Sequence, residues 1–297
     1  MNKLTINDNY NQYDIIIDKF KIFLGSNVKT KIRLIQTIRS YFQTSKLSDY
    51  GAANHLNRIL SWNEQYLDKR RFFLYELNQY YGLDKDLKLG SQSLILKYYE
   101  TIFENIQYLD EVNTINTLLE CFNNEYINKH GQFDDVTGIT LISSLDSINT
   151  KFLIKIMGLK LLKDDFNAYE FDLDYDEIIL FQLNLLRKIS SDQSSKDFII
   201  IMDIPILTEK ILESLHFNSA NISILIFPFF IENLNHLNYK DIVLCGNTMI
   251  DLCNEEQLYD LSLDLPVNYS VEELRDRMFQ KISQFIFDKT DFVSFLE

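Results

Sequence analysis

The stretch from Phe20 to Ile38 has the residue order of a phosphate-binding loop. An apolar segment, "KIFLG", ends at Gly25, and a basic amphipathic segment begins around Lys29 and Thr30. In such loops the backbone N–H groups at a helix N-terminus and a lysine neutralise phosphate charge. Only three residues separate Gly25 from Lys29, so the loop is two residues shorter than the full motif, and Val28 replaces its second glycine. A β-branched residue resists positive φ, so we predict a remnant that cannot form the full phosphate cradle.

A second part of an ATPase-like site is suggested by "DFIIIMD", an apolar strand that ends at Asp203. An aspartate at this point can hold magnesium in such enzymes. Here Ile204 and Pro205 follow it in place of a catalytic acid, which argues against hydrolysis. Asp203 could equally be a strand-end or helix-capping residue. A nucleotide hydrolase with an unusual phosphate loop is therefore the alternative to a protein with no enzymatic activity.

Four carboxylates lie within six residues in "DLDYDE", namely Asp172, Asp174, Asp176 and Glu177. Uncompensated, they repel one another, and Ca²⁺ suits such a group because it accepts six to eight oxygen ligands in flexible geometry. The glycine and the distal glutamate of an EF-hand are missing. The alternative is helix capping with a solvated acidic face, since charge runs usually have that role.

The net charge of −14 disfavours nucleic-acid binding by the protein as a whole. The charges are segregated, however: residues 164–177 include seven acidic residues and no basic residue. Five basic residues lie within fifteen positions near the loop, and these are Lys19, Lys21, Lys29, Lys31 and Arg33. They could form a local basic surface, or both segments could be ordinary solvated faces.

The composition is that of a globular protein, with 46% hydrophobic residues among 297 and only eight glycines and three prolines. Few turn residues favour long helices over an all-β fold. The three cysteines show no C-x-x-C spacing and the four histidines no metal-ligand spacing. The N-terminus has no apolar signal segment, and the longest apolar run, residues 222–231, contains Pro228. We therefore expect a cytoplasmic protein without a membrane span.

The hydrophobic pattern changes twice along the chain. Strands "YDIIID", "KIFLG" and "RFFLYEL" surround one helix, 29–42, and residues 91–189 then repeat apolar residues with helical periodicity. Strands return in "DFIIIMD", "NISILIF" and "DIVLCGN", with a helix in "PILTEKILESL", and the end from Asn254 looks helical. Alternating strands and helices predict a largely parallel sheet. We predict an α/β head from residues 1–90 and 190–297 and an inserted α-helical leg from residues 91–189.

The order of these segments resembles the Csn-two family, the accessory spacer-acquisition protein of type II-A CRISPR–Cas systems. The similar segments are "FLGSN" before a basic helix, "SQSLILKYYETIF", "FDLDYDEIILFQL", "DFIIIMDIPILTEKILESL" and "NISILIFPFFIENL". The chain is longer than the compact members, with extra sequence around Ser45 to Asp68 and after Asn254. Oligomeric contacts could therefore differ from theirs.

The resemblance implies a degenerate P-loop ATPase-like head, no enzymatic activity, no nucleotide, and a tetrameric ring that encircles double-stranded DNA ends with calcium bound. It further implies partners in the CRISPR integrase complex and the RNA-guided effector nuclease, and it favours calcium at the four carboxylates. For DNA contacts, Lys151 and Lys155 on the leg join the five basic residues near the loop. A helical scaffold that never touches DNA is a further alternative.

Overall fold

The computed structural model describes residues 1–8, 10–43, 59–91, 93–104, 106–127, 132–134, 140–142, 144–193, 195–216, 221–234, 236–246, 248–265, 267 and 269–282. The extra segment predicted near Ser45 lies outside these residues as far as position 58, and so does the end of the chain after Ile282. The chain divides into two compact units. Unit 1 contains residues 1–81, 175–183 and 194–297, and unit 2 contains residues 82–174 and 184–193.

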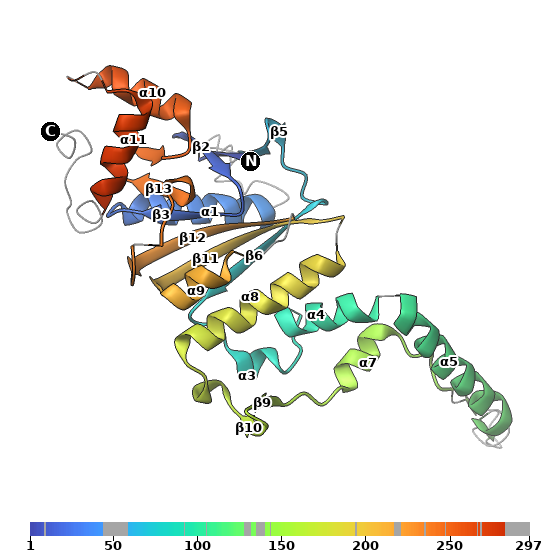
Figure 1. The fold of residues 1–297 in the computed structure, drawn as a ribbon. Helices are drawn as coiled ribbons and strands as arrows, with labels where there is room; N and C mark the ends of the chain where they lie inside the picture. Colours follow the sequence, from blue (N-terminus) through green and yellow to red (C-terminus); the bar gives the residue numbers. More distant parts are fainter. Residues whose placement is uncertain are drawn as a thin grey trace. The chain divides into compact units, whose positions relative to one another are not determined.

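The main feature of unit 1 is a six-stranded sheet in the order β14-β13-β3-β12-β11-β6 (Figure 1). Its strands are β3 (Phe20–Leu24), β6 (Phe72–Asn78), β11 (Asp197–Leu207), β12 (Ile222–Ile231), β13 (Ile242–Cys245) and β14 (Met249–Asp251). All neighbouring strands are parallel except β13 and β14, which are antiparallel. The predicted α/β fold with a largely parallel sheet is confirmed.

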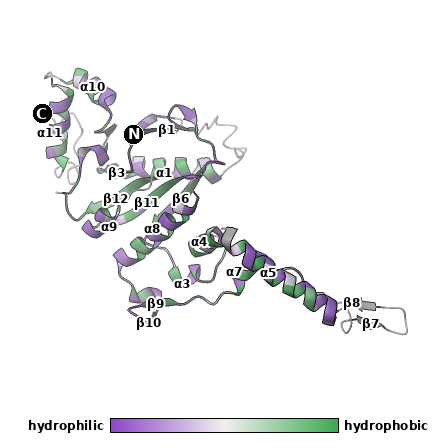
Figure 2. Ribbon diagram, turned by 45° about the vertical axis from the view of Figure 1, so that its right-hand side comes forward, coloured by the Kyte–Doolittle hydropathy of each residue, from purple (hydrophilic) through white to green (hydrophobic). Residues whose placement is uncertain are grey.

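The central strands are apolar because helices and a second sheet cover them. Ile199 to Met202 of β11 and Ile224 to Ile226 of β12 are almost completely buried, and Figure 2 shows these strands coloured hydrophobic. Strands buried on both faces read as continuous apolar runs rather than as alternating ones. This is why the sequence pattern located them.

A four-stranded sheet in the order β2-β1-β4-β5 completes the sheet structure of unit 1. Its strands are β1 (Asn2–Asn7), β2 (Gln12–Ile17), β4 (Ile59–Trp62) and β5 (Gln65–Tyr66). Helix α1 (Val28–Gln43) packs its apolar side, Leu34, Ile35 and Ile38, into one core with residues from both sheets. In that core the Phe23 and Phe227 rings stack with centroids 4.3 Å apart. The short helices of this unit are α9 (Glu209–Ser214), η3 (Tyr239–Asp241), α10 (Glu255–Asp264) and α11 (Val271–Gln280).

Unit 2 is less uniformly helical than predicted. It contains α3 (Leu83–Asp86), α4 (Leu94–Phe103), α5 (Ile106–Phe122), the π-helix η1 (Asn123–Ile127), α7 (Thr150–Ile156) and η2 (Glu170–Asp172). It also contains two short hairpins, β7 (Gln132–Asp134) with β8 (Thr140–Ile142) and β9 (Leu161–Lys163) with β10 (Phe166–Ala168). Helix α8 (Tyr175–Asp192) contributes residues to both units.

The helical periodicity predicted over residues 91–189 is interrupted at residues 144–149, which are not helical, for a local reason. The Asn116 amide exchanges two hydrogen bonds with the backbone of Ile148, which holds that segment extended. Asn149 then caps the next helix by accepting from the N–H of Phe152 at 2.8 Å, so α7 begins only at Thr150. Side chains of this kind that bond to the backbone compete with helix formation and favour caps.

Two sequence expectations about element ends need correction. Strand β11 does not end at Asp203 but continues through Pro205 to Leu207, and the helix that follows begins at Glu209 rather than at Pro205. The first boundary between the units falls after Tyr81, where the sequence analysis placed it after residue 90. No helix in the described part of the chain is long and apolar enough to cross a membrane.

Candidate phosphate loop and nucleic-acid interface

Hydrogen bonds of Asn27 close the loop that resembles a phosphate loop. Gly25, between β3 and α1, has φ of 119°, a conformation that L side chains rarely adopt. The Asn27 carbonyl oxygen Oδ1 accepts from the N–H of Thr30 at 3.1 Å, and its Nδ2 donates to Gly246 O at 2.8 Å. The N–H of Asn27 itself donates to Cys245 O at 3.2 Å. These bonds use N–H groups that a phosphate would need at the start of α1.

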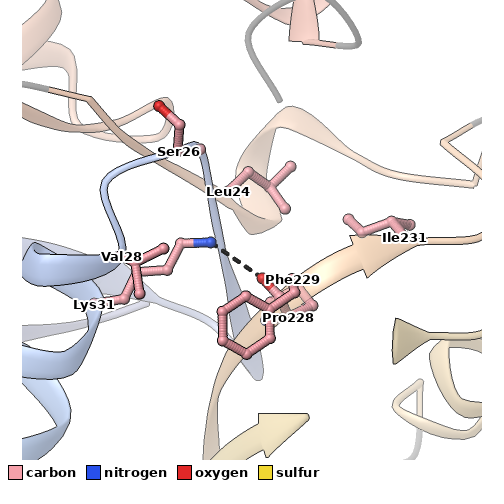
Figure 3. A pocket seen from close by; sticks show the side chains of 8 residues that line it. Leu24, Ser26, Val28, Lys31, Pro228, Phe229 and Ile231 are labelled. Carbon is pink, nitrogen blue, oxygen red and sulfur yellow. Dashed lines mark hydrogen bonds between the residues drawn. The ribbon is translucent and has the colours of Figure 1, made fainter. Parts of the chain in front are cut away.

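The lysine that reaches this loop is Lys31, not Lys29. Its Nζ donates to Pro228 O at 3.1 Å, and its side chain is buried (Figure 3). Burial lowers the pKa of Lys31. Lys29 is exposed on the surface of α1. Because α1 begins at Val28, the residue three positions further along, Lys31, faces the loop. The sequence pattern did not show where the helix begins, so it could not indicate which lysine faces the loop.

The cavity beside Lys31 is too small for a nucleotide. Its volume is about 120 Å³, against about 300–1,000 Å³ for typical small-molecule sites. Most of its lining is apolar and includes Leu24, Val28, Phe229 and Ile231. In Figure 3 the Lys31 amine points across this space towards Pro228. The site therefore contains a buried amine that is already hydrogen-bonded to a carbonyl oxygen, and it has little space for a triphosphate.

Asp203 lies in the middle of β11, half-buried, between Asn78 of β6 and Phe227 of β12. A nearby cation is Arg39 of α1, which forms a two-pronged pair with Glu76 at 2.7 and 2.6 Å. The hydrogen bond to Glu76 raises the pKa of Arg39, and the charge of Asp203 contributes in the same direction. If Asp203 held magnesium, the ion would lie beside its carboxylate. The Arg39 guanidinium already supplies positive charge near that carboxylate.

Lys21 does not lie on any surface, which corrects its prediction as a DNA contact. Its side chain is completely buried, and its Nζ lies 2.6 Å from Oδ1 of Asp251, whose side chain is also completely buried. The same amine donates to Lys240 O, while Asp251 accepts from the N–H groups of Ile16 and Cys253. The pair therefore joins β2, β3 and β14 inside unit 1. A buried ion pair needs this many additional bonds to offset its desolvation.

The other predicted basic residues near the loop are separated from one another. Lys29 is exposed, and Arg33, one turn further on α1, has a side chain that is 41% exposed. The Arg33 guanidinium lies 3.5 Å from Asp8 and over the ring of Tyr10. Lys19 is partly exposed and lines a different cavity, together with Asp18 and other polar groups. Of the five, Lys29 and Arg33 are the two on α1 that reach the surface, and Arg33 is already paired with Asp8.

In unit 2, Lys151 and Lys155 are both exposed and lie one turn apart on α7. Each of them is accordingly accessible to a phosphate on the surface of that unit. Exposure alone does not distinguish a DNA contact from a solvated lysine.

The four carboxylates of the predicted calcium site fall in two units, Asp172 and Asp174 in unit 2 and Asp176 and Glu177 in unit 1. Asp172 accepts from the N–H of Tyr169 at 2.7 Å, and Asp176 accepts from the Thr208 hydroxyl at 2.8 Å. Asp176 and Glu177 lie in the first turn of α8, where negative charge stabilises a helix. Across the described ranges, no group of three or more His, Cys, Asp or Glu side chains is placed to hold a metal ion.

Comparison with known proteins finds solved structures of similar fold. No protein-family model matches the chain, and no curated protein sequence matches it. Among solved structures the chain is similar to the crystal structure of Stu0660 of Streptococcus thermophilus, with a TM-score of 0.64 and 14% sequence identity. The match covers 93% of this chain and 84% of that one. At this identity, the similarity shows a shared fold.

Proposed function

We propose that this chain is a non-enzymatic protein that binds the ends of double-stranded DNA and supports acquisition of new spacers in type II-A CRISPR–Cas immunity. The observation that carries the absence of catalysis is the closed loop: Asn27 caps α1, and the buried Lys31 amine is bonded to Pro228 O. The resemblance of the chain to the Csn-two family supports the DNA-related role. The fold that the chain shares with Stu0660 over 93% of its length supports the architecture assumed in this proposal.

In this proposal the protein assembles as a ring-shaped homo-oligomer, a tetramer, that holds DNA through phosphate contacts. The candidates that are accessible are Lys29 and Arg33 on α1 and Lys151 and Lys155 on α7. A protein with a net charge of −14 must confine such contacts to local basic surfaces. Contacts to phosphates do not depend on the base sequence of the DNA, so the affinity should be the same for duplexes of different sequence.

The proposal includes Ca²⁺ at the acidic segment and interactions with the CRISPR integrase complex and the RNA-guided effector nuclease. The calcium assignment is supported by donor chemistry, because all four candidate side chains supply carboxylate oxygens, which hard cations prefer. Bound Ca²⁺ would neutralise these side chains, which otherwise repel one another. The partners follow from the family resemblance.

The experiment is a titration of a linear duplex with wild type and with Lys29→Ala/Arg33→Ala at several salt concentrations, followed by fluorescence anisotropy. We expect log K to fall linearly with log salt, and the double variant to bind more weakly with a slope smaller by about two, one for each phosphate contact. Lys210→Ala serves as the matched control, since Lys210 is an exposed lysine on α9. Affinity that does not change with salt, or equal slopes for wild type and the double variant, would contradict the phosphate-contact model.

A further inference from the structure

Unit 1 contains a further cavity, larger than the one beside Lys31, at the end of the six-stranded sheet where β6, β11 and β12 begin. Its volume is about 340 Å³, within the range of small-molecule sites in proteins. Residues at the beginnings of β6, β11 and β12 line it, including Phe72, Asp197 and Ser223. The phosphate loop instead follows the end of β3, which runs parallel to these strands. No pattern in the local sequence marks this cavity.

The hairpin between β4 and β5 forms another wall of the cavity. Its turn, Asn63 and Glu64, has positive φ at both positions, which matches the twist of a two-residue hairpin. Asn63 is fixed in place, because its Oδ1 accepts from the N–H of Lys3 and its Nδ2 donates to Asn2 Oδ1. The turn thereby presents Trp62 and Gln65, which are paired across the hairpin, to the cavity.

Several polar groups in the cavity are available to a ligand. Among the described residues, the Gln65 amide and the Ser223 hydroxyl have no hydrogen-bond partner, and neither has the Trp62 indole N–H. Arg71 donates to Asp197 at 2.6 Å, with the Arg71 side chain 65% exposed. This pair places donors next to a carboxylate acceptor. An amide, a hydroxyl and a paired donor and acceptor beside an indole ring suit a flat, uncharged ring that carries both donors and acceptors.

One basic side chain, that of Arg71, lines the cavity itself. Lys69, Arg70 and Arg71 are consecutive in the turn before β6, and all three are exposed. Lys196 donates to Arg70 O at 2.9 Å, but its amine lies over the ring of Phe73, which does not line the cavity. An exposed guanidinium beside a polar cavity with an aromatic wall suits a nucleotide, with its base inside the cavity and its phosphate near Arg71.

We propose that this cavity binds one nucleotide, whose base stacks on Trp62 and hydrogen-bonds to Gln65 and Ser223 while its phosphate lies near Arg71. The inference rests on the proposed function, because it names a site for the terminal nucleotide of a DNA strand. A free mononucleotide has the same chemistry. The two sources are separated by the ligands used in the test.

The test uses the fluorescence of Trp62, the one tryptophan in the chain. Wild type is titrated with each of the four deoxynucleoside monophosphates, with deoxyribose 5-phosphate, and with duplexes that end either blunt or in a short single-stranded extension. We expect saturable quenching by the nucleotides and by the extended duplex, and none by the sugar phosphate. Stronger binding of the extended duplex than of mononucleotides identifies a strand end as the source, and the reverse identifies a free nucleotide.

The variants are Gln65→Ala and Arg71→Ala, with Gln36→Ala as the matched control because Gln36 is exposed on α1. Loss of one base contact in Gln65→Ala, or of the phosphate contact in Arg71→Ala, should weaken nucleotide binding about tenfold, whereas the control should bind as wild type does. Absence of quenching by every nucleotide, equal quenching by deoxyribose 5-phosphate, or unchanged affinity in Gln65→Ala would overturn the proposal. Failure of the DNA-binding function is distinguishable, because it appears as loss of anisotropy with blunt duplex whether or not mononucleotides quench Trp62.

Discussion

Lys21 offers the clearest test of the structure, because the sequence predicted it as a surface DNA contact whereas it is completely buried against Asp251. We consider Lys21→Met, which keeps much of the side-chain volume and removes the charge. The Asp251 carboxylate would then be left inside unit 1 without its cation. It would keep two backbone donors, the N–H groups of Ile16 and Cys253 at 2.7 and 2.9 Å.

Breaking a buried ion pair by removing one partner costs about 3–5 kcal/mol. Because two backbone hydrogen bonds to Asp251 remain, we place the loss at the lower end, about 3 kcal/mol. In a domain of this size each kcal/mol lowers the melting temperature by about 2–4 °C, so we expect a decrease of about 6–12 °C. Thermal unfolding followed by circular dichroism measures it.

Two further variants make this prediction specific. Lys29→Met removes an exposed lysine from α1 and should change stability by less than about 0.5 kcal/mol. Lys21→Met/Asp251→Leu removes both charges and should recover most of the stability, since apolar replacement of a buried pair is often neutral. If Lys21→Met melts like wild type and lowers DNA affinity, the burial of Lys21 is wrong and the sequence-based prediction is right.

Three other changes have defined outcomes. Asn27→Ala should destabilise unit 1 by about 1 kcal/mol in chemical denaturation, because the N–H of Thr30 loses its cap, whereas an unchanged midpoint would mean that the cap is not formed. Burial raises the pKa of Asp241 from 3.8 to about 6. The folded state therefore binds this proton more tightly than the unfolded chain does, and above about pH 6 the buried charge lowers the free energy of unfolding. Asp241→Asn should therefore melt higher than wild type at pH 7, with the gain disappearing as the pH falls towards 3.8, and a gain independent of pH would refute this cause. Calcium should raise the melting temperature of wild type more than magnesium does, and Asp174→Asn/Glu177→Gln should lose that gain; equal gains in both proteins would remove the calcium site.

The sequence was most informative where burial dictates residue type. β11 and β12 were located because strands covered on both faces must be apolar along their whole length. β1, "NKLTIN", was not identified, because polar residues occupy both of its ends and only Leu4 and Ile6 are buried. The predicted end of β11 is wrong because Pro205, a residue common at helix starts, lies inside the strand, which continues to Leu207.

The candidate site was less predictable, because it depends on helix phase and on contacts distant in sequence. The loop motif and its defect at Val28 were visible, but whether Lys29 or Lys31 faces the loop depends on where α1 begins. The partner of Lys21 lies 230 residues further along the chain, so no local pattern could indicate its burial. The cavity around Trp62 likewise collects residues from two sheets, and local periodicity carries no information about that arrangement.

The central claim, that the protein encircles DNA ends, is tested most directly by the topology of the ligand. A linear duplex and a relaxed closed circle of equal length and sequence are offered to the protein in competition, at a salt concentration where phosphate contacts are measurable. A closed ring must pass over an end, so we predict strong binding of the linear form, weak binding of the circle, and full recovery when a nuclease cuts the circle once. Equal affinity for the circle and the linear form would contradict the encircling geometry.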